Sequence, residues 1–304
     1  MSDNHIDEES GIATTGHEWD GIRELDNPMP RWWLWIFYAS IVWSIGYWVL
    51  MPAWPALPGM QGHTTGIVGN SERVNVAADL DALQASRSEN FAQLEAAPGY
   101  SAIEADPVLF RFALAAGDSA FGNFCATCHG AGAQGFVGYP NLNDDVWLWG
   151  GSFDAIRTTI RYGIRSDHPD THFSQMPAFG ADGLLSREDV RHVRDYVLSL
   201  SGETGFEAAA LNAGGEIFAS QCATCHRDSG MGDVSQGAPD LTDAIWLYGG
   251  SPEQVESAIW RGPFGVMPAW EGRLNDPTIT ALATYVYSLG GGEIAPANDG
   301  AAGE

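Results

Sequence analysis

The residues with the most distinctive chemistry in this 304-residue chain lie in two copies of one pentapeptide, Cys-Ala-Thr-Cys-His. The reactive side chains of the two copies are Cys125, Cys128, His129, Cys222, Cys225 and His226. In a C-x-x-C-H motif both thiols form thioether bonds with the vinyl groups of a haem, and the adjacent histidine faces the iron. The motifs therefore predict two covalently attached haems c, with His129 and His226 as proximal ligands.

Two other kinds of site use a C-x-x-C pair. A thioredoxin-like redox pair needs a βαβ context, and a zinc site needs a different spacing of its ligands. The two motifs account for all four cysteines of the chain. A dihaem electron carrier is the interpretation that the motifs favour.

The chain is strongly acidic, with a formal net charge of -25 and 14 basic side chains, all of them arginine. This balance excludes nucleic acid as a partner. It is compatible with ordinary solubility or with electrostatic attraction of a basic partner.

A 20-residue segment without charge, residues 32–51, follows a polar and acidic N-terminal stretch, residues 1–31. Its length suits a helix that spans a bilayer, and Trp and Tyr lie near both of its ends. A cleaved signal peptide would need a basic start and a small-residue cleavage site, and a buried core helix would not carry five tryptophans. We expect a single membrane anchor preceded by a flexible acidic tail.

Two arguments give the same orientation for this anchor. Arg23 and Arg31 precede the segment, and Arg73 is the first positive residue after it, so the N-terminus is expected in the cytoplasm. Haem c is attached outside the cytoplasm in bacteria, which places the haem domains in the periplasm. The expected location is the bacterial inner membrane.

The segment that follows, residues 52–105, reads as a linker. It starts with an extended, proline-rich exit from the membrane and continues as an amphipathic helix over residues 74–96. This helix is expected to pack on a haem domain or on a partner subunit.

The remainder is a tandem repeat. Gly117 and Phe121 precede the first motif as Gly214 and Phe218 precede the second, and Trp-Leu-Trp-Gly-Gly-Ser at 147–152 matches Trp-Leu-Tyr-Gly-Gly-Ser at 246–251. Met-Pro-Ala recurs at 176 and 267, and a terminal helical pattern recurs around Tyr196 and Tyr285. The repeat predicts two domains, residues 106–203 and 204–291, followed by a flexible tail, residues 292–304.

Each copy is expected to be all-helical. Capping residues place a middle helix after Ser152 and after Ser251, and a last helix after Ser186 and at Asp276. The last helix of each copy is expected to cross its first helix. The fold class is therefore all-α, with one transmembrane helix and two tandem haem domains.

The order Gly-x-x-x-Phe, C-x-x-C-H, Pro-x-Leu, Met-Pro and a terminal helix with an aromatic residue resembles a class I c-type cytochrome, twice over. The Pro-x-Leu segments begin at Pro140 and Pro239. The resemblance implies that their carbonyl groups accept the proton of the proximal imidazole Nδ1.

The stretch Asp-Asn-Pro-Met-Pro-Arg-Trp-Trp at 26–33, ahead of one span and two such domains, resembles the dihaem subunit of cbb3-type cytochrome c oxidases, the CcoP or FixP family. The resemblance implies electron transfer from a soluble basic cytochrome c, through two haems, toward a catalytic haem b and copper subunit. That complex reduces O2 and pumps protons. It also implies a monohaem membrane cytochrome c subunit as a partner, and no substrate chemistry on this chain.

The repeat selects Met176 as the sixth ligand of the first haem iron and Met267 as that of the second, and Met ligation gives a higher potential than bis-His ligation. The first copy is longer here, because Met176 lies 13 positions after Gly163 whereas Met267 lies 5 positions after Gly262. The longer loop contains His168 and His172, so either of these could replace Met176.

Four further side chains could bind haem propionates. Trp147 and Trp246 supply indole N–H groups, and Arg157 and Arg161 supply positive charge on the first middle helix. Surface ion pairs are an equally good explanation of the arginines.

Two alternatives to an oxidase subunit stay open at this stage. The first is a free-standing membrane-anchored dihaem carrier that serves another reductase. The second is a haem sensor that loses its Met ligand and binds a gas.

Overall fold

The computed structural model describes residues 5–55 and 62–292 of the chain. Residues 293–304 of the expected C-terminal tail and residues 56–61 of the expected linker lie outside the described residues. The described part divides into two compact units, one that ends at Ser86 and one that starts at Arg87.

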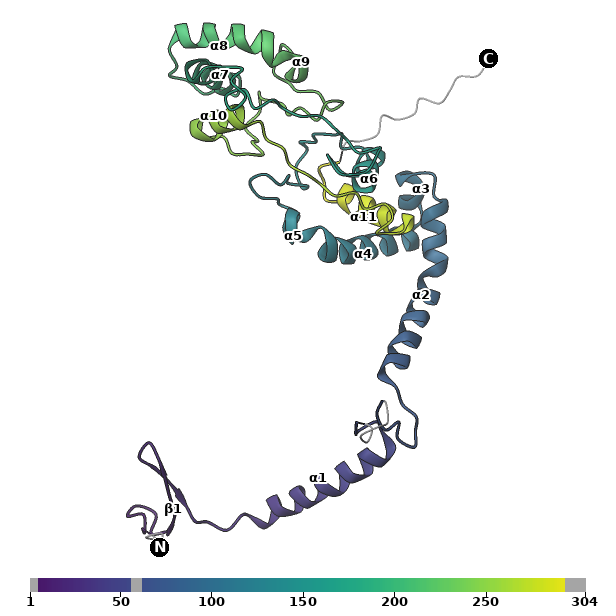
Figure 1. The fold of residues 1–304 in the computed structure, drawn as a ribbon. Coiled ribbons are helices and arrows are strands. Elements are labelled where there is room, and N and C mark those ends of the chain that lie inside the picture. Colours follow the sequence, from purple (N-terminus) through teal and green to yellow (C-terminus); the bar gives the residue numbers. More distant parts are fainter. Residues whose placement is uncertain (1–4, 56–61, 293–304) are drawn as a thin grey trace. The chain divides into compact units, whose positions relative to one another are not determined.

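The N-terminal unit contains a β-hairpin and a long helix (Figure 1). Its elements are β1 (Thr14–Trp19), β2 (Ile22–Leu25) and α1 (Arg31–Leu50). The expected acidic tail thus contains regular structure. Asp20 and Gly21 form the two-residue turn with φ values of 49° and 83°, which is the left-handed geometry that Asp-Gly adopts readily in hairpins.

The helix α1 has the length and composition of a membrane span. None of its side chains is buried, its mean hydropathy is 1.4, and aromatic side chains lie on all its sides. Ser40 and Ser44 donate to backbone carbonyls within the helix, so their hydroxyls need no water. These features agree with the predicted anchor.

The helices of the second unit follow the pattern of the repeat. They are α3 (Tyr100–Ala105), α4 (Pro107–Phe124), α5 (Ala126–His129), α6 (Phe153–Tyr162), α7 (Arg187–Leu200), α8 (Ala208–Gln221), α9 (Ala223–His226), α10 (Pro252–Arg261) and α11 (Asp276–Ser288). The predicted caps Ser152, Ser186 and Ser251 each accept from the backbone N–H three residues later. Asn275, rather than Asp276, caps α11.

Helix α2 (Glu72–Ala96) confirms the predicted helical segment before the repeat. Leu94 at its C-terminal end is 1% exposed, and the ring of Phe91 packs edge-on against Phe112 of α4 at 5.2 Å. This end of the helix therefore belongs to the core of the second unit.

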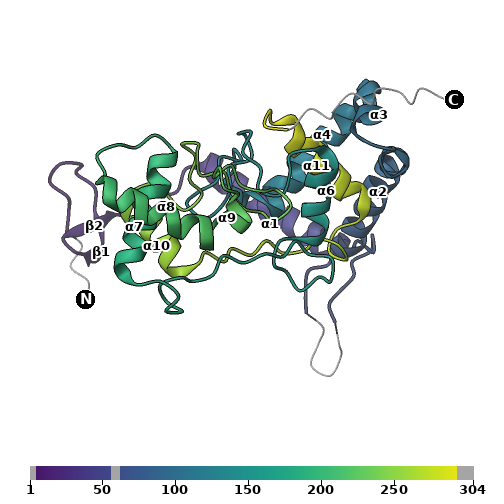
Figure 2. The same cartoon turned by 90° about the horizontal axis from the view of Figure 1, so that it is seen from above.

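The second unit contains two hydrophobic cores, each built from both copies of the repeat. The first core joins α4 and α6 of the first copy to α11 of the second copy. The second core joins α8 and α10 of the second copy to α7 of the first copy. Figures 1 and 2 both show α11 beside α4 and α6, and α7 beside α8 and α10. The ranges 106–203 and 204–291 expected from the repeat therefore do not describe the two cores.

The last helix of each copy meets the first helix of the other copy at a glycine. A Cβ on Gly117 of α4 would overlap the carbonyl oxygen of Ala281 and the Cβ of Tyr285, both on α11. Correspondingly, a Cβ on Gly214 of α8 would overlap the carbonyl oxygen of His192 and the Cβ of Tyr196 on α7. The small side chain permits this close approach of two backbones.

We expect Gly117→Ala to lower the free energy of unfolding by about 1–3 kcal/mol, because the added methyl would meet backbone atoms that cannot rotate away. Denaturant unfolding measures the change. Gly122→Ala on the same helix is the matched control, since a Cβ there meets nothing within 4 Å. The control should be neutral or stabilising; equal losses in both variants would contradict the close crossing.

Candidate functional site

Each C-x-x-C-H motif joins the end of a core helix to the one-turn helix that directly follows it, α5 or α9. Cys125 ends α4 and Cys222 ends α8, and the backbone N–H groups of His129 and His226 donate to these cysteine carbonyls at 3.0 Å. The two thiols and the imidazole of each motif are therefore held on one turn.

Both proximal histidines are oriented as expected from the Pro-x-Leu segments. His129 Nδ1 lies 3.1 Å from the Pro140 carbonyl oxygen, and His226 Nδ1 lies 3.0 Å from that of Pro239. A carbonyl oxygen can only accept, so Nδ1 carries the proton and Nε2 keeps its lone pair. Burial lowers the pKa of both imidazoles, which favours this neutral form.

Each histidine opens onto its own cavity. The first cavity has about 730 Å³ of empty space, its open mouth included, and is lined by Cys125, His129 and residues of α6 and α11. The second cavity encloses about 1300 Å³, its open mouth included, and is lined by Cys222, Cys225, His226 and residues of α10. Apart from a few polar groups the walls are apolar, which suits a flat aromatic ligand.

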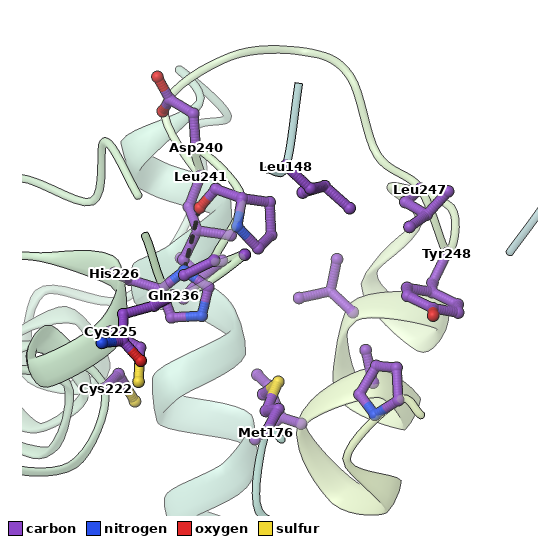
Figure 3. Close-up of a pocket in the computed structure, with 18 of the residues that line it drawn as sticks. Leu148, Met176, Cys222, Cys225, His226, Gln236, Asp240, Leu241, Leu247 and Tyr248 are labelled. Carbon is purple, nitrogen blue, oxygen red and sulfur yellow. Dashed lines mark hydrogen bonds between the residues drawn. The ribbon is translucent and has the colours of Figure 1, made fainter. Parts of the chain in front are cut away.

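The methionines are exchanged between the cavities along with the helices. Met267 lines the first cavity with His129, whereas Met176 lines the second cavity with His226. Figure 3 shows Met176 and His226 at different sides of the second cavity, with Cys222 and Cys225 beside His226. The expected pairing of Met176 with the first motif is therefore not the arrangement in the structure.

The backbone fixes this exchange at the ends of the middle helices. Ile164 and Met267 exchange two backbone hydrogen bonds, of 2.9 and 3.0 Å. Gly163 packs against the Met267 carbonyl, and Gly262 packs against the Met176 carbonyl. The segment that carries each Met thus crosses the C-terminus of the other copy's middle helix.

The two histidines of the longer loop are engaged by other side chains. His168 Nε2 lies 2.8 Å from Glu271 Oε2 and its ring stacks on Tyr162. His172 Nε2 lies 3.1 Å from Thr159 Oγ1 and its ring stacks on Trp149 at 4.6 Å. Neither lines a cavity in the described part of the chain, so the geometry favours Met176.

The expected propionate partners differ in their positions. Trp147 lines the first cavity, but its indole N–H donates to the Gly291 carbonyl, and Trp246 lines the second cavity. Arg157 pairs with Asp154 at 3.3 Å and Arg161 with Asp276 at 3.0 Å, and neither arginine lines a cavity. The geometry thus favours ion pairs for Arg157 and Arg161.

Sequence reasoning missed two features of the cavity walls. Leu148 lines both cavities, and Trp149 lines the first while packing on Gly237, which lines the second. Arg165 lines the second cavity. The repeated Trp-Leu-aromatic segment was a usable signal for Leu148, whereas Arg165 has no basic counterpart in the second copy.

The residues of both cavities fit a covalently held haem. Each offers half-buried cysteine sulfur at its wall, an imidazole lone pair, a methionine and apolar sides. Burial raises the pKa of Cys125 and Cys222 to about 11, so both are neutral thiols in the haem-free chain. Such a fold and donor set define a c-type cytochrome.

Comparison with known proteins narrows this class. Residues 11–58 match the N-terminal domain of cytochrome oxidase-cbb3, FixP, and residues 112–197 and 209–286 match cytochrome c oxidase, cbb3-type, subunit III. The chain belongs to the family of subunit III of cbb3-type cytochrome c oxidases.

Curated relatives are similar over nearly their whole length. The cbb3-type cytochrome c oxidase subunit FixP of Bradyrhizobium diazoefficiens is 50% identical over 297 residues, which cover 96% of this chain and 100% of the relative. Subunit CcoP of Cereibacter sphaeroides is 50% identical over 281 residues, which cover 92% and 95%.

We expect Gly262→Ala to lower the free energy of unfolding by about 1–3 kcal/mol more than Gly183→Ala does. Both glycines have left-handed backbone, with φ values of 61° and 70°, so both variants carry that strain. Only at Gly262 would the methyl also meet backbone of the Met176 segment, because Gly183 has nothing within 4 Å. Denaturant unfolding of the two variants separates contact from strain, and equal losses would contradict the packing of Gly262 on this segment.

Proposed function

We propose that the chain is the dihaem electron-transfer subunit of a membrane haem-copper oxidase. The observation that carries the proposal is the pair of cavities, each lined by at least one cysteine of its C-x-x-C-H motif, one oriented imidazole and one methionine, on a chain of the cbb3 subunit III family. The bound haems supply a reversible one-electron couple at each cavity. The chain itself supplies attachment, ligands and apolar walls that exclude water.

In this proposal the axial ligands are paired across the repeat. His129 and Met267 serve the haem on Cys125 and Cys128, and His226 and Met176 serve the haem on Cys222 and Cys225. The carbonyls of Pro140 and Pro239 fix the ring orientation and raise the basicity of each imidazole. A bound haem would take one histidine and one methionine of this chain as iron ligands, which would leave no place for O2, so the proposed role is relay without substrate chemistry.

The proposed location is the bacterial inner membrane, with α1 as the single anchor, the N-terminus in the cytoplasm and the haem cavities in the periplasm. The uncharged stretch of α1 that follows Arg31 supports the span, and Arg23 together with Arg31, the first residue of α1, supports the orientation. The partners would be the catalytic haem b and copper subunit and a monohaem membrane cytochrome c subunit.

A soluble basic cytochrome c is the proposed electron donor. The loops after the two Pro-x-Leu segments bring acidic side chains together. The pKa of Asp243 is raised, chiefly by burial and further by the negative charges of Asp240, Asp144 and Asp145. Such a concentration of negative charge increases the association rate of a basic protein at low salt.

A single-haem series tests the crossed ligands. In a chain with Cys222→Ala and Cys225→Ala, only the first haem is attached, and Met267→His should lower its potential because a second imidazole replaces the thioether. Met176→His in the same background should leave that potential unchanged. Redox titration followed by absorbance measures both, and a shift caused by Met176→His alone would show that ligands pair within each copy.

Gentle detergent purification from the native membrane tests the assignment to an oxidase. We expect copper, haem b and oxygen uptake with reduced cytochrome c to accompany the chain, since the relatives are named as subunits of that complex. A dihaem chain that consistently purifies without copper would instead support a free-standing carrier. A carbon monoxide difference spectrum of the chain alone tests the sensor alternative, which requires an open iron position.

A further inference from the structure

The second cavity contains a positive charge that the protein does not neutralise. Arg165 lines this cavity and is half-buried, and burial lowers the pKa of its guanidinium. No carboxylate of the described residues lies within ion-pair distance of Arg165, although the chain has 39 acidic side chains. A partly desolvated cation of this kind is costly unless an anion accompanies it.

The structure holds Arg165 firmly in this position. Its Nε donates to the Gly265 carbonyl at 2.6 Å and its Nη1 to the Ser174 carbonyl at 3.0 Å. The guanidinium also lies 5.4 Å from the centre of the Phe264 ring. The backbone of Arg165 has a φ of 51°, an unfavourable value for a residue with a side chain. A guanidinium has five N–H donors, so the two carbonyls leave donors free.

The other charged group on the wall does not serve as a partner. Asp240 lines the same cavity, but its Oδ1 accepts from the backbone N–H of Thr242 at 2.7 Å and from the Thr242 hydroxyl at 2.6 Å. No ion pair joins Asp240 to Arg165 in the described residues. The anion that would complete the site must therefore come from a ligand of the cavity.

The first cavity has no such charge. Its lining among the described residues is apolar or neutral, and Arg157 and Arg161 on the adjacent helix pair with Asp154 and Asp276. At the position of Arg165, two residues after Gly163, the second copy has Phe264, two residues after Gly262. The two haem sites are therefore electrostatically different despite their common motif.

We propose that Arg165 binds a propionate carboxylate of the haem attached to Cys222 and Cys225, and thereby raises the potential of this haem alone. The inference rests on the proposed function, because it requires a haem in the second cavity. A fixed positive charge stabilises the reduced state, which carries one more electron. Arg165 is a positioning and tuning residue, and it biases the electron toward the haem of His226.

The test uses the full-length chain purified in detergent, with Met267→His as the parent. This substitution lowers the reduction potential of the first haem. In a redox titration the transition that remains at high potential therefore belongs to the haem of His226. Adding Arg165→Gln should change the equilibrium constant for reduction of that haem on the order of tenfold, which is about 59 mV downward. Arg165→Lys should restore most of the shift, since it keeps the charge.

Arg157→Gln is the matched control, because it removes the same charge from an ion pair outside both cavities. The Arg157→Gln variant should leave the potential of the haem of His226 unchanged. Equal shifts in the two Gln variants, no shift in Arg165→Gln, or a shift confined to the low-potential haem would each overturn the role of Arg165. A pyridine haemochrome count of the unmodified chain separates the two proposals, since fewer than two haems would remove the proposed function itself.

Discussion

The close contact of two helix backbones is the constraint on which the second unit depends. Gly117 meets α11 and Gly214 meets α7 with no room for a side chain, and Phe121 and Phe218 then pack on Tyr285 and Tyr196 at 5.4 and 5.2 Å. Once these crossings form, the segment between each middle helix and last helix must pass from one core to the other. The exchange of Met176 and Met267 between the cavities follows from this path.

Much of the local structure was predictable because it depends on neighbouring residues. The caps Ser152, Ser186 and Ser251, the helical segment before the repeat and the contacts of His129 and His226 with proline carbonyls all involve short sequence separations or one motif. The uncharged segment of α1 is predictable for the same reason, since its length and composition alone indicate a span.

The pairing of the two copies was not predictable from the repeat. Gly117 of α4 could pack on α7, which carries Tyr196, or on α11, which carries Tyr285. The repeated Gly-x-x-x-Phe and Tyr residues are compatible with either pairing of helices. The position of Arg165 at a cavity wall was not predictable for a related reason. The long loop that contains Arg165 has no counterpart in the second copy, and polar loops are usually exposed. The hairpin of β1 and β2 was missed although Asp20-Gly21 is a strong turn signal, because the charge of the stretch suggested a flexible tail.

The exchange of last helices also changes what a half of this chain would be. Residues 106–203 supply the first motif with α4 and α6 but lack Met267 and α11, and they carry α7, whose packing partners α8 and α10 lie in the other half. A chain that stops after the first repeat therefore contains neither cavity in full. The first core cannot close until α11, in the last part of the described residues, has been synthesised. Both hydrophobic cores thus require both copies of the repeat.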